Sequence, residues 1–191
     1  MFLVDDLLNQ ALEVIREEIV DQRNVSRETI THARKAMRRL AASLSETVEY
    51  LEGGLHTLHR VADNREVFSQ ALSDLTGQEN LQRNCSESGI CEDLRLAQDE
   101  LRELHKTIKL PKSKETINDL IYQIDGYERE FVRAVREFLV ISREFDLNAL
   151  RDKDALDPNL VLEAFALQID ELKRIVLKID DVVNSLRGNR T

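Results

Sequence analysis

The stretch SRETITHARKAMRRLAASLSETVEYLEGGLHTL, residues 26–58, decides the fold of this chain. Its apolar residues recur every three or four positions, which is the period of an α-helix, with one extra step of four after Leu44. The apolar seam consists of Ile30, Ala33, Met37, Leu40, Leu44, Val48, Leu51, Leu55 and Leu58. We predict one long helix that begins after Ser26, because the serine hydroxyl can accept a hydrogen bond from a free N–H of the first turn.

Two adjacent glycines lie inside the second half of this pattern, at Gly53 and Gly54. Each glycine costs about 1 kcal/mol relative to alanine in a helix interior. The pair therefore indicates either a kink in the helix or a close crossing by a neighbouring element.

The helical period continues on both sides of this stretch and predicts five more helices. They cover about residues 4–20, 63–77, 90–108, 113–145 and 157–188. Residues 77–89, with the sequence GQENLQRNCSESG, lack the period and are rich in turn formers. We predict a flexible loop there.

Three of the predicted helices begin at residues suited to that position. These are Asp63, which can form a capping box with Glu66, Ser113, which follows the helix-stopping Pro111, and Asp157, which precedes Pro158. The helix boundaries are therefore predicted from local capping chemistry as well as from the apolar period.

Taken together, the pattern predicts an all-α fold. The three longest helices each have about eight to ten turns, and the helices at 63–77 and 90–108 would match them if stacked end to end. We predict an elongated antiparallel helical bundle, about four long rods built from six helices, with coiled-coil-like packing in one domain, 1–191. The broad apolar stripe of 113–145 favours a central rod there, roughly 50 Å long.

The composition limits where the protein acts. A net charge of −9 argues against nonspecific binding to nucleic acid, so no DNA partner is expected, and membrane binding is a weak alternative. The N-terminus lacks the basic region of a secretory signal, and no apolar run is long enough for a membrane span. We expect a cytoplasmic protein in which Cys85 and Cys91 are free thiols, with a local disulfide as the alternative in an oxidising compartment.

A basic run within the first quoted stretch supplies the candidate binding site. His32, Lys35 and Arg39 are three and four residues apart, so they share one face of the predicted helix, away from the apolar seam. This row is either a binding surface or a set of cations that pair with acidic neighbouring helices. One such neighbour is the first helix, which carries Glu13, Glu17, Glu18 and Asp21.

Arg27 and His32 also have the spacing of a nuclease signature. The pair resembles the Arg-x4-His motif of HEPN-type ribonucleases, which implies an all-helical enzyme that acts on a phosphodiester through these two residues. The sequence departs from that family at Glu28, where a small polar residue is usual, so the pair is a weak match to the family.

The row also resembles the basic helices of polyphosphate-binding CHAD domains, over one or two turns. That resemblance implies a phosphate ligand held by His32, Lys35 and Arg39. Those domains are far more basic than this chain, and a phosphate clamp needs several such rows to converge.

His56 and His59, with Glu52 one turn earlier, could begin a surface metal site. The pattern lacks the further ligands that zinc or iron requires. We expect no metal and no cofactor.

The sequence favours a noncatalytic bundle that acts through protein–protein contacts, as an adaptor, a regulatory module or an assembly subunit, with a protein partner or self-association. One alternative is the ribonuclease that uses Arg27 and His32. The other is a membrane-directed effector, because the architecture loosely resembles HeLo-type cell-death domains. In the effector, the first helix, starting at Phe2 and Leu3, would insert into the bilayer.

Overall fold

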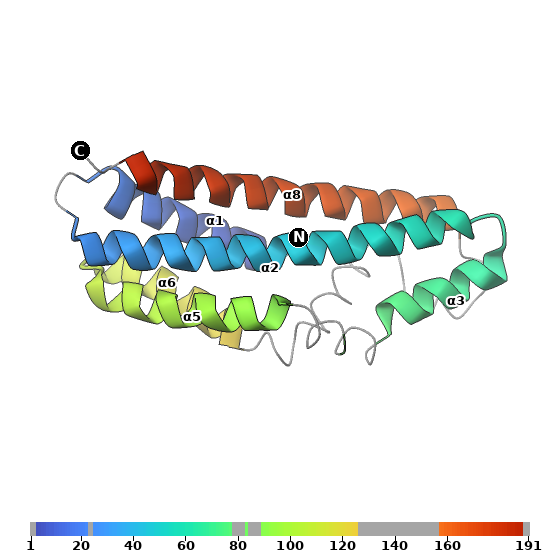
Figure 1. Cartoon of the computed structure of the whole chain (residues 1–191), viewed down its shortest axis with the longest axis horizontal. Coiled ribbons are helices and arrows are strands. Elements are labelled where there is room, and N and C mark those ends of the chain that lie inside the picture. Colours follow the sequence, from blue (N-terminus) through green and yellow to red (C-terminus); the bar gives the residue numbers. More distant parts are fainter. Residues whose placement is uncertain (1–2, 23–24, 78–82, 84–88, 126–156, 189–191) are drawn as a thin grey trace.

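A computed structural model describes residues 3–22, 25–77, 83, 89–125 and 157–188, and these parts of the chain are helical, without strands. Figure 1 shows an elongated bundle, which confirms the predicted all-α fold. Its elements are α1 (Leu3–Ile15), the π-helix η1 (Arg16–Val20), α2 (Arg27–Arg60), α3 (Arg65–Thr76), α5 (Ile90–Thr107), α6 (Pro111–Asp125) and α8 (Pro158–Gly188).

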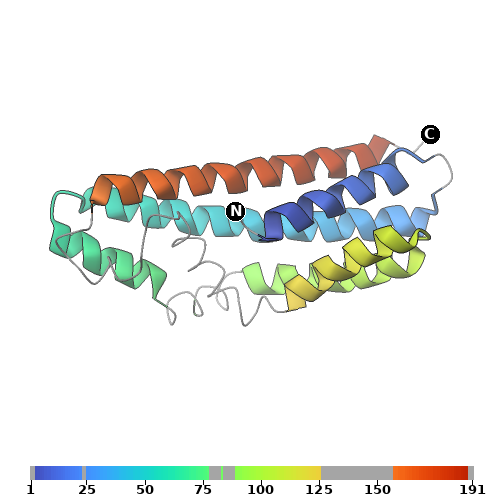
Figure 2. The same ribbon diagram turned by 180° about the vertical axis from the view of Figure 1, so that it is seen from behind.

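The longest helix, α2, runs the length of the bundle, and α8 lies beside it in the opposite direction (Figure 1). On another side of α2, α5 and α3 follow one another end to end, as the sequence predicts. Figure 2 shows α1 and α6 side by side along the half of the bundle that contains α5. Within the described helices α2 therefore holds the central position, and the rod predicted at 113–145 is described only as far as Asp125.

Two of the predicted helix starts are confirmed by hydrogen bonds. The Ser26 hydroxyl accepts from the backbone N–H of Thr29 at 3.1 Å, so Ser26 caps α2. The Asp157 carboxylate accepts from the N–H of Asn159 at 2.9 Å, directly before α8. In both cases a side-chain oxygen satisfies an N–H that the first turn leaves without a partner.

Two other starts were predicted at the wrong residue. Asn64, and not Asp63, caps α3, because its extended backbone lets the amide oxygen accept from the N–H of Val67 at 3.3 Å. Likewise α6 begins at Pro111, so this proline opens a helix, and Ser113 lies buried within the first turn. Proline fits the first turn because no intrahelical N–H bond is required there.

The buried side chains form two apolar clusters along the bundle. The first joins α1, α2, α5, α6 and α8 in one half of the molecule, and includes Ile15, Met37, Leu101, Ile117 and Ile179. The second joins α2, α3 and α8 in the other half. It comprises Val48, Leu51, Leu58, Phe68, Leu72, Val161, Leu162, Phe165, Ile169 and Leu172.

The two central glycines of α2 have different surroundings, although the helix is continuous through both. A Cβ atom built on Gly53 would meet nothing within 4 Å, whereas one on Gly54 would lie 2.6 Å from both methyl carbons of Leu75. Of the two alternatives raised by the sequence, the close crossing is therefore correct, and the crossing element is α3. Tyr50 reinforces this contact, since its hydroxyl donates to the backbone oxygen of Leu75 at 3.0 Å.

This difference predicts opposite outcomes for two neighbouring substitutions. Gly53→Ala should raise the free energy of unfolding by about 0.5–1 kcal/mol, because alanine favours the helix and meets no neighbour. Gly54→Ala should be at least about 1 kcal/mol less stable than Gly53→Ala, since its methyl group displaces Leu75. Urea unfolding followed by circular dichroism measures both, and equal stability of the two variants would contradict the close contact.

Parts of two predicted segments lie outside the described residues. These parts are most of the loop at 77–89 and the second half of the rod at 113–145, whose described part ends with α6 at Asp125. In the described helices, no stretch is both long and apolar enough to span a bilayer.

Candidate functional site

The predicted basic row faces α5, where acidic side chains meet it. His32 Nδ1 lies 2.6 Å from Glu100 Oε2, and Lys35 Nζ donates to Glu100 Oε1 at 3.0 Å. One turn further along α2, Arg39 Nη1 donates to Asp93 Oδ1 at 2.6 Å. The three cations thus lie on one face, as predicted, and each has a carboxylate partner.

Glu100 is the centre of this network because it receives two partners. A carboxylate only accepts hydrogen bonds, so the His32 Nδ1–H donates to it. Burial acts to raise the pKa of Glu100, but the hydrogen bonds and charges of His32 and Lys35 outweigh burial and lower this pKa below its usual value. The side chains of His32 and Glu100 are 19% and 22% exposed, so this pair is screened from water better than an ordinary surface pair.

The pairing of the row with an acidic neighbouring helix is confirmed, but the helix is not the first one, which was given as the example. The carboxylates are Glu100 and Asp93 of α5. Ser43 adds a further contact between the same helices, since its hydroxyl donates to the backbone oxygen of Ile90 at 3.2 Å. The geometry of the row therefore braces α2 against α5, and its role in binding a partner stays a prediction.

Removing the Glu100 charge should destabilise the protein in a pH-dependent way. A carboxyl whose pKa is lower in the folded state stabilises the fold above its unfolded pKa of about 4.3, and this stabilisation disappears as the pH falls through the folded pKa. Glu100→Gln should therefore cost about 1 kcal/mol at pH 7 and progressively less in acid below pH ~4. Urea unfolding at pH 7 and pH 3 measures the difference.

The matched control for this experiment is Glu103→Gln, on the same helix. Glu103 pairs with Lys106, three residues away, and the two side chains are 49% and 66% exposed. Its substitution should change stability by less than about 0.5 kcal/mol at either pH. Equal losses for Glu100→Gln and Glu103→Gln would contradict the bracing role of Glu100.

The two residues of the nuclease-like spacing have different environments. Arg27 is exposed in the first turn of α2, while His32 is mostly buried against Glu100. The second ring nitrogen of His32, Nε2, lies 4.0 Å from Glu28 Oε1. The imidazole is thus held between two carboxylates, one on its own helix and one on α5.

The histidines considered for a metal site lie near the end of α2. His56 and His59 are both exposed, and Glu52 pairs with Lys173 of α8 at 2.6 Å. The hydrogen bond to Glu52 raises the pKa of Lys173. Among the residues that the structure describes, no three His, Cys, Asp or Glu side chains gather closely enough to hold a metal ion.

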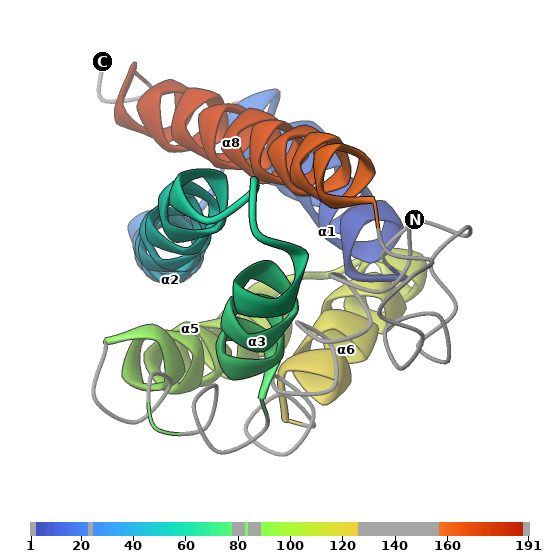
Figure 3. The same cartoon turned by 90° about the vertical axis from the view of Figure 1, so that its right-hand side faces the viewer.

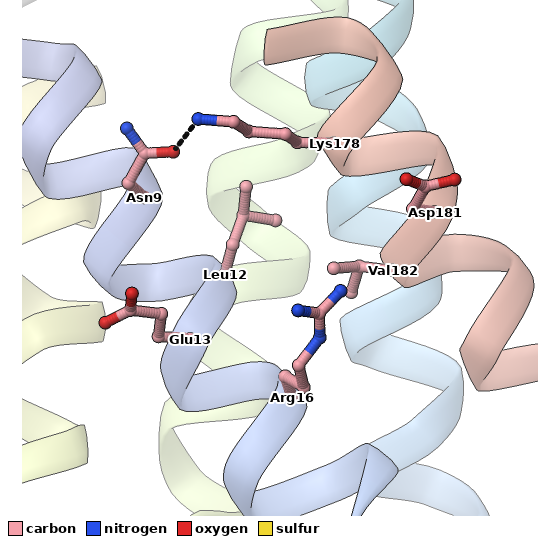
Figure 4. Close-up of a pocket in the computed structure, with 7 residues that line it drawn as sticks. All are labelled: Asn9, Leu12, Glu13, Arg16, Lys178, Asp181 and Val182. Atoms are coloured by element: carbon pink, nitrogen blue, oxygen red, sulfur yellow. Dashed lines mark hydrogen bonds between the residues drawn. The ribbon is translucent and has the colours of Figure 1, made fainter. Parts of the chain in front are cut away.

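Sequence reasoning did not find an open cleft of about 310 Å³ between α8 and the N-terminal helices α1 and η1 (Figure 4). Lys178 reaches across it and donates to Asn9 Oδ1 at 3.1 Å. The charged residues that line the cleft are Glu13, Arg16, Lys178 and Asp181. Two cations are balanced by two carboxylates, so the cleft does not concentrate one sign of charge. Only the packing of α1 on α8 brings these residues together, and no sequence motif marks them.

The expectation of free thiols is wrong for Cys91. This residue, in the first turn of α5, is disulfide-bonded in the structure, and the described residues contain no free cysteine. Cys85, the second cysteine of the chain, lies outside the described residues.

No protein-family model, curated protein sequence or solved structure matches the chain. Inferences about its function therefore depend on the residues and contacts described above.

Proposed function

We propose that this chain is a noncatalytic helical-bundle protein that acts through protein–protein contacts, as an adaptor, a regulatory module or a subunit of an assembly. One observation supports this proposal above the others. Three leucines of α8, Leu160, Leu167 and Leu177, are 55%, 64% and 64% exposed. Single exposed leucines are ordinary, but a row of them on the outer face of one helix is a feature of surfaces that bind other proteins.

The basic row supports the same reading by a different route. Ion pairs with Glu100 and Asp93 engage His32, Lys35 and Arg39 within the bundle. Because these side chains hold α2 and α5 together, they favour a rigid scaffold. Its contacts with other proteins would then be made by the outer faces of the helices.

A capture experiment with matched variants tests the proposal. The immobilised full chain is exposed to cell extract, and its solution mass is measured in parallel. Leu167→Glu, on α8, should abolish capture or self-association. Leu110→Glu should not, because Leu110 is also well exposed (55%, against 64% for Leu167) but lies outside α8. A wild-type monomer that captures nothing would contradict the proposal.

The ribonuclease alternative has a direct test. It requires Arg27 and His32 to act on a phosphodiester, and so predicts RNA cleavage that His32→Ala abolishes. Intact RNA after incubation with wild-type protein would eliminate this alternative.

The membrane-effector alternative requires α1 to leave the bundle and insert into a bilayer. Leu8, Ala11, Leu12 and Ile15 of α1 are buried, so release would expose this apolar face. Leakage of dye from liposomes tests the idea, and its absence with both neutral and anionic lipids would eliminate it.

The cytoplasmic location expected from the sequence is proposed together with this function, and the disulfide at Cys91 is an observation against it. Structural disulfides are rare in reducing compartments. Counting free thiols in protein isolated under acid quench decides between the two. Two thiols per chain support the cytoplasm, and none supports an oxidising compartment.

A further inference from the structure

The outer face of α8 carries a continuous stripe at coiled-coil spacing. Its positions alternate in steps of three and four residues, and all are exposed. They are Leu160, Glu163, Leu167, Asp170, Arg174 and Leu177. Figure 3, seen along the bundle, shows α8 at the periphery, with α1 and α2 on its inner side. The stripe is therefore opposite the face that α8 buries.

This stripe is complementary to itself when two copies of α8 pack antiparallel. In such a pair, the residue numbers of facing positions add to a constant. If that constant is 337, Leu160 faces Leu177 of the second copy, and Glu163 faces Arg174. The remaining layer places Leu167 beside Asp170 at the twofold axis. Each leucine and charge contact occurs twice, because the two halves of a twofold interface are identical.

Other arrangements of the same stripe bring like charges together or lose the leucine and charge contacts. A parallel pair would place Glu163 against its own copy, and Asp170 against its own copy. Shifting the antiparallel register by one heptad would place Glu163 against Asp181 in one direction. In the other direction it would place Glu163 against Leu167 and Leu160 against Asp170, so the leucine contacts and the charge pairs are both lost. Like charges in direct contact disfavour an interface, so of these arrangements only the register with the constant 337 combines leucine contacts and opposite-charge pairs without facing like charges.

We propose that the outer face of α8 is the interface of an antiparallel homodimer with Leu160 packed on Leu177 and Glu163 paired with Arg174 of the second copy. This inference depends on the proposed function, for which it names the surface and the partner. Arg174 now bonds Glu171 of its own chain at 3.1 Å, with both side chains exposed. An exposed ion pair of this kind contributes little to the stability of the monomer. Breaking it so that Arg174 can pair with Glu163 of the second copy therefore costs little free energy.

The expected dimer is weak. The stripe covers 18 residues, or about 27 Å of helix, which is short for an obligate interface. We expect a dissociation constant in the micromolar range at moderate salt, with affinity falling as salt screens the charge pairs.

Sedimentation equilibrium of the full chain over a concentration series tests the proposal through a charge swap. Glu163→Arg and Arg174→Glu should each weaken the dimer by about tenfold or more, because each creates two like-charge contacts. The double variant carrying both changes should recover wild-type affinity to within about threefold, since the charges are exchanged and not lost. Leu177→Glu should abolish dimerisation, and Leu110→Glu should leave it unchanged.

All of these substitutions are at exposed positions, so thermal unfolding followed by circular dichroism should be nearly unchanged. Additive losses in the double variant, or a dimer indifferent to Leu177→Glu, would overturn the proposed interface. A wild-type monomer at all concentrations would overturn it as well. If that monomer captured another protein through α8, the proposed function would survive without the dimer, and if it captured nothing, both would fail.

Discussion

Replacing Phe68 with alanine should lower the free energy of unfolding by about 3–5 kcal/mol, the largest effect expected for a single substitution in this protein. Phe68 is fully buried, at 0% exposure, in the cluster that α3 forms with α2 and α8. Among the described residues of α3, only Phe68 and Leu72 are buried, at 0% and 4% exposure. Loss of the ring therefore removes the largest buried side chain of this helix and leaves a cavity.

The adjacent residue provides a matched control. Val67 is 45% exposed on the same turn of α3, and Val67→Ala should change stability by less than about 1 kcal/mol. Urea unfolding followed by circular dichroism measures both variants, and hydrogen exchange shows whether α3 opens first. If Phe68→Ala costs no more than Val67→Ala, the packing of α3 against the second cluster is wrong.

Most of the fold was predictable because one physical requirement determines it. Each helix must bury an apolar stripe, and the residues of the stripe recur in the sequence at the helical period. In α5 they include Ile90, Leu94, Leu101 and Leu104. The end-to-end arrangement of α3 and α5 followed from matching helix lengths. These properties are local or additive, so they can be read without knowing the three-dimensional contacts.

The exact helix starts were less predictable, because adjacent residues had equal capping ability. Asp63 and Asn64 are both good N-caps, and the backbone turn that precedes α3 determines that Asn64 occupies the capping position. Similarly, Pro111 can end one helix or begin the next. The backbone path of Ile108, which has an extended conformation, ended α5 before the proline was reached.

The basic row was predictable, but its partners were not. His32 and Arg39 are seven residues apart on α2, and Asp93 and Glu100 are seven apart on α5. This equal spacing was available in the sequence as a signal that the two faces could pair. It did not identify α5 as the neighbour, because the packing order of helices depends on contacts between residues far apart in the sequence, here 47 to 68 positions.

The register between α2 and α5 leads to the second large prediction. The facing pairs His32 with Glu100, Arg39 with Asp93, and Ser43 with Ile90 have numbers that add to 132, 132 and 133. By the same register, Ala36 of α2 lies opposite Ala97 of α5, and both are 0% exposed. Two facing alanines allow the helix axes to approach closely, because neither side chain extends beyond Cβ.

Ala97→Leu should therefore lower the free energy of unfolding by about 2–3 kcal/mol, since three added carbon atoms have no space at this crossing. Ala42→Leu is the control, because Ala42 is partly exposed on α2 and its enlargement should cost less than about 0.5 kcal/mol. Denaturant unfolding of the two variants gives the difference. Equal stability would contradict the close approach of α2 and α5.

Ala97→Leu should also weaken the ion pairs between α2 and α5, because separating the two helices lengthens the contact between His32 and Glu100. In the wild type, Glu100→Gln is expected to cost about 1 kcal/mol at pH 7. In the Ala97→Leu background, this cost should fall to less than half, which a double-mutant cycle measures directly. If Glu100→Gln still costs about 1 kcal/mol in that background, the network does not depend on the alanine contact. The side chains of the ion pairs would then adjust to keep their contacts when the helices separate.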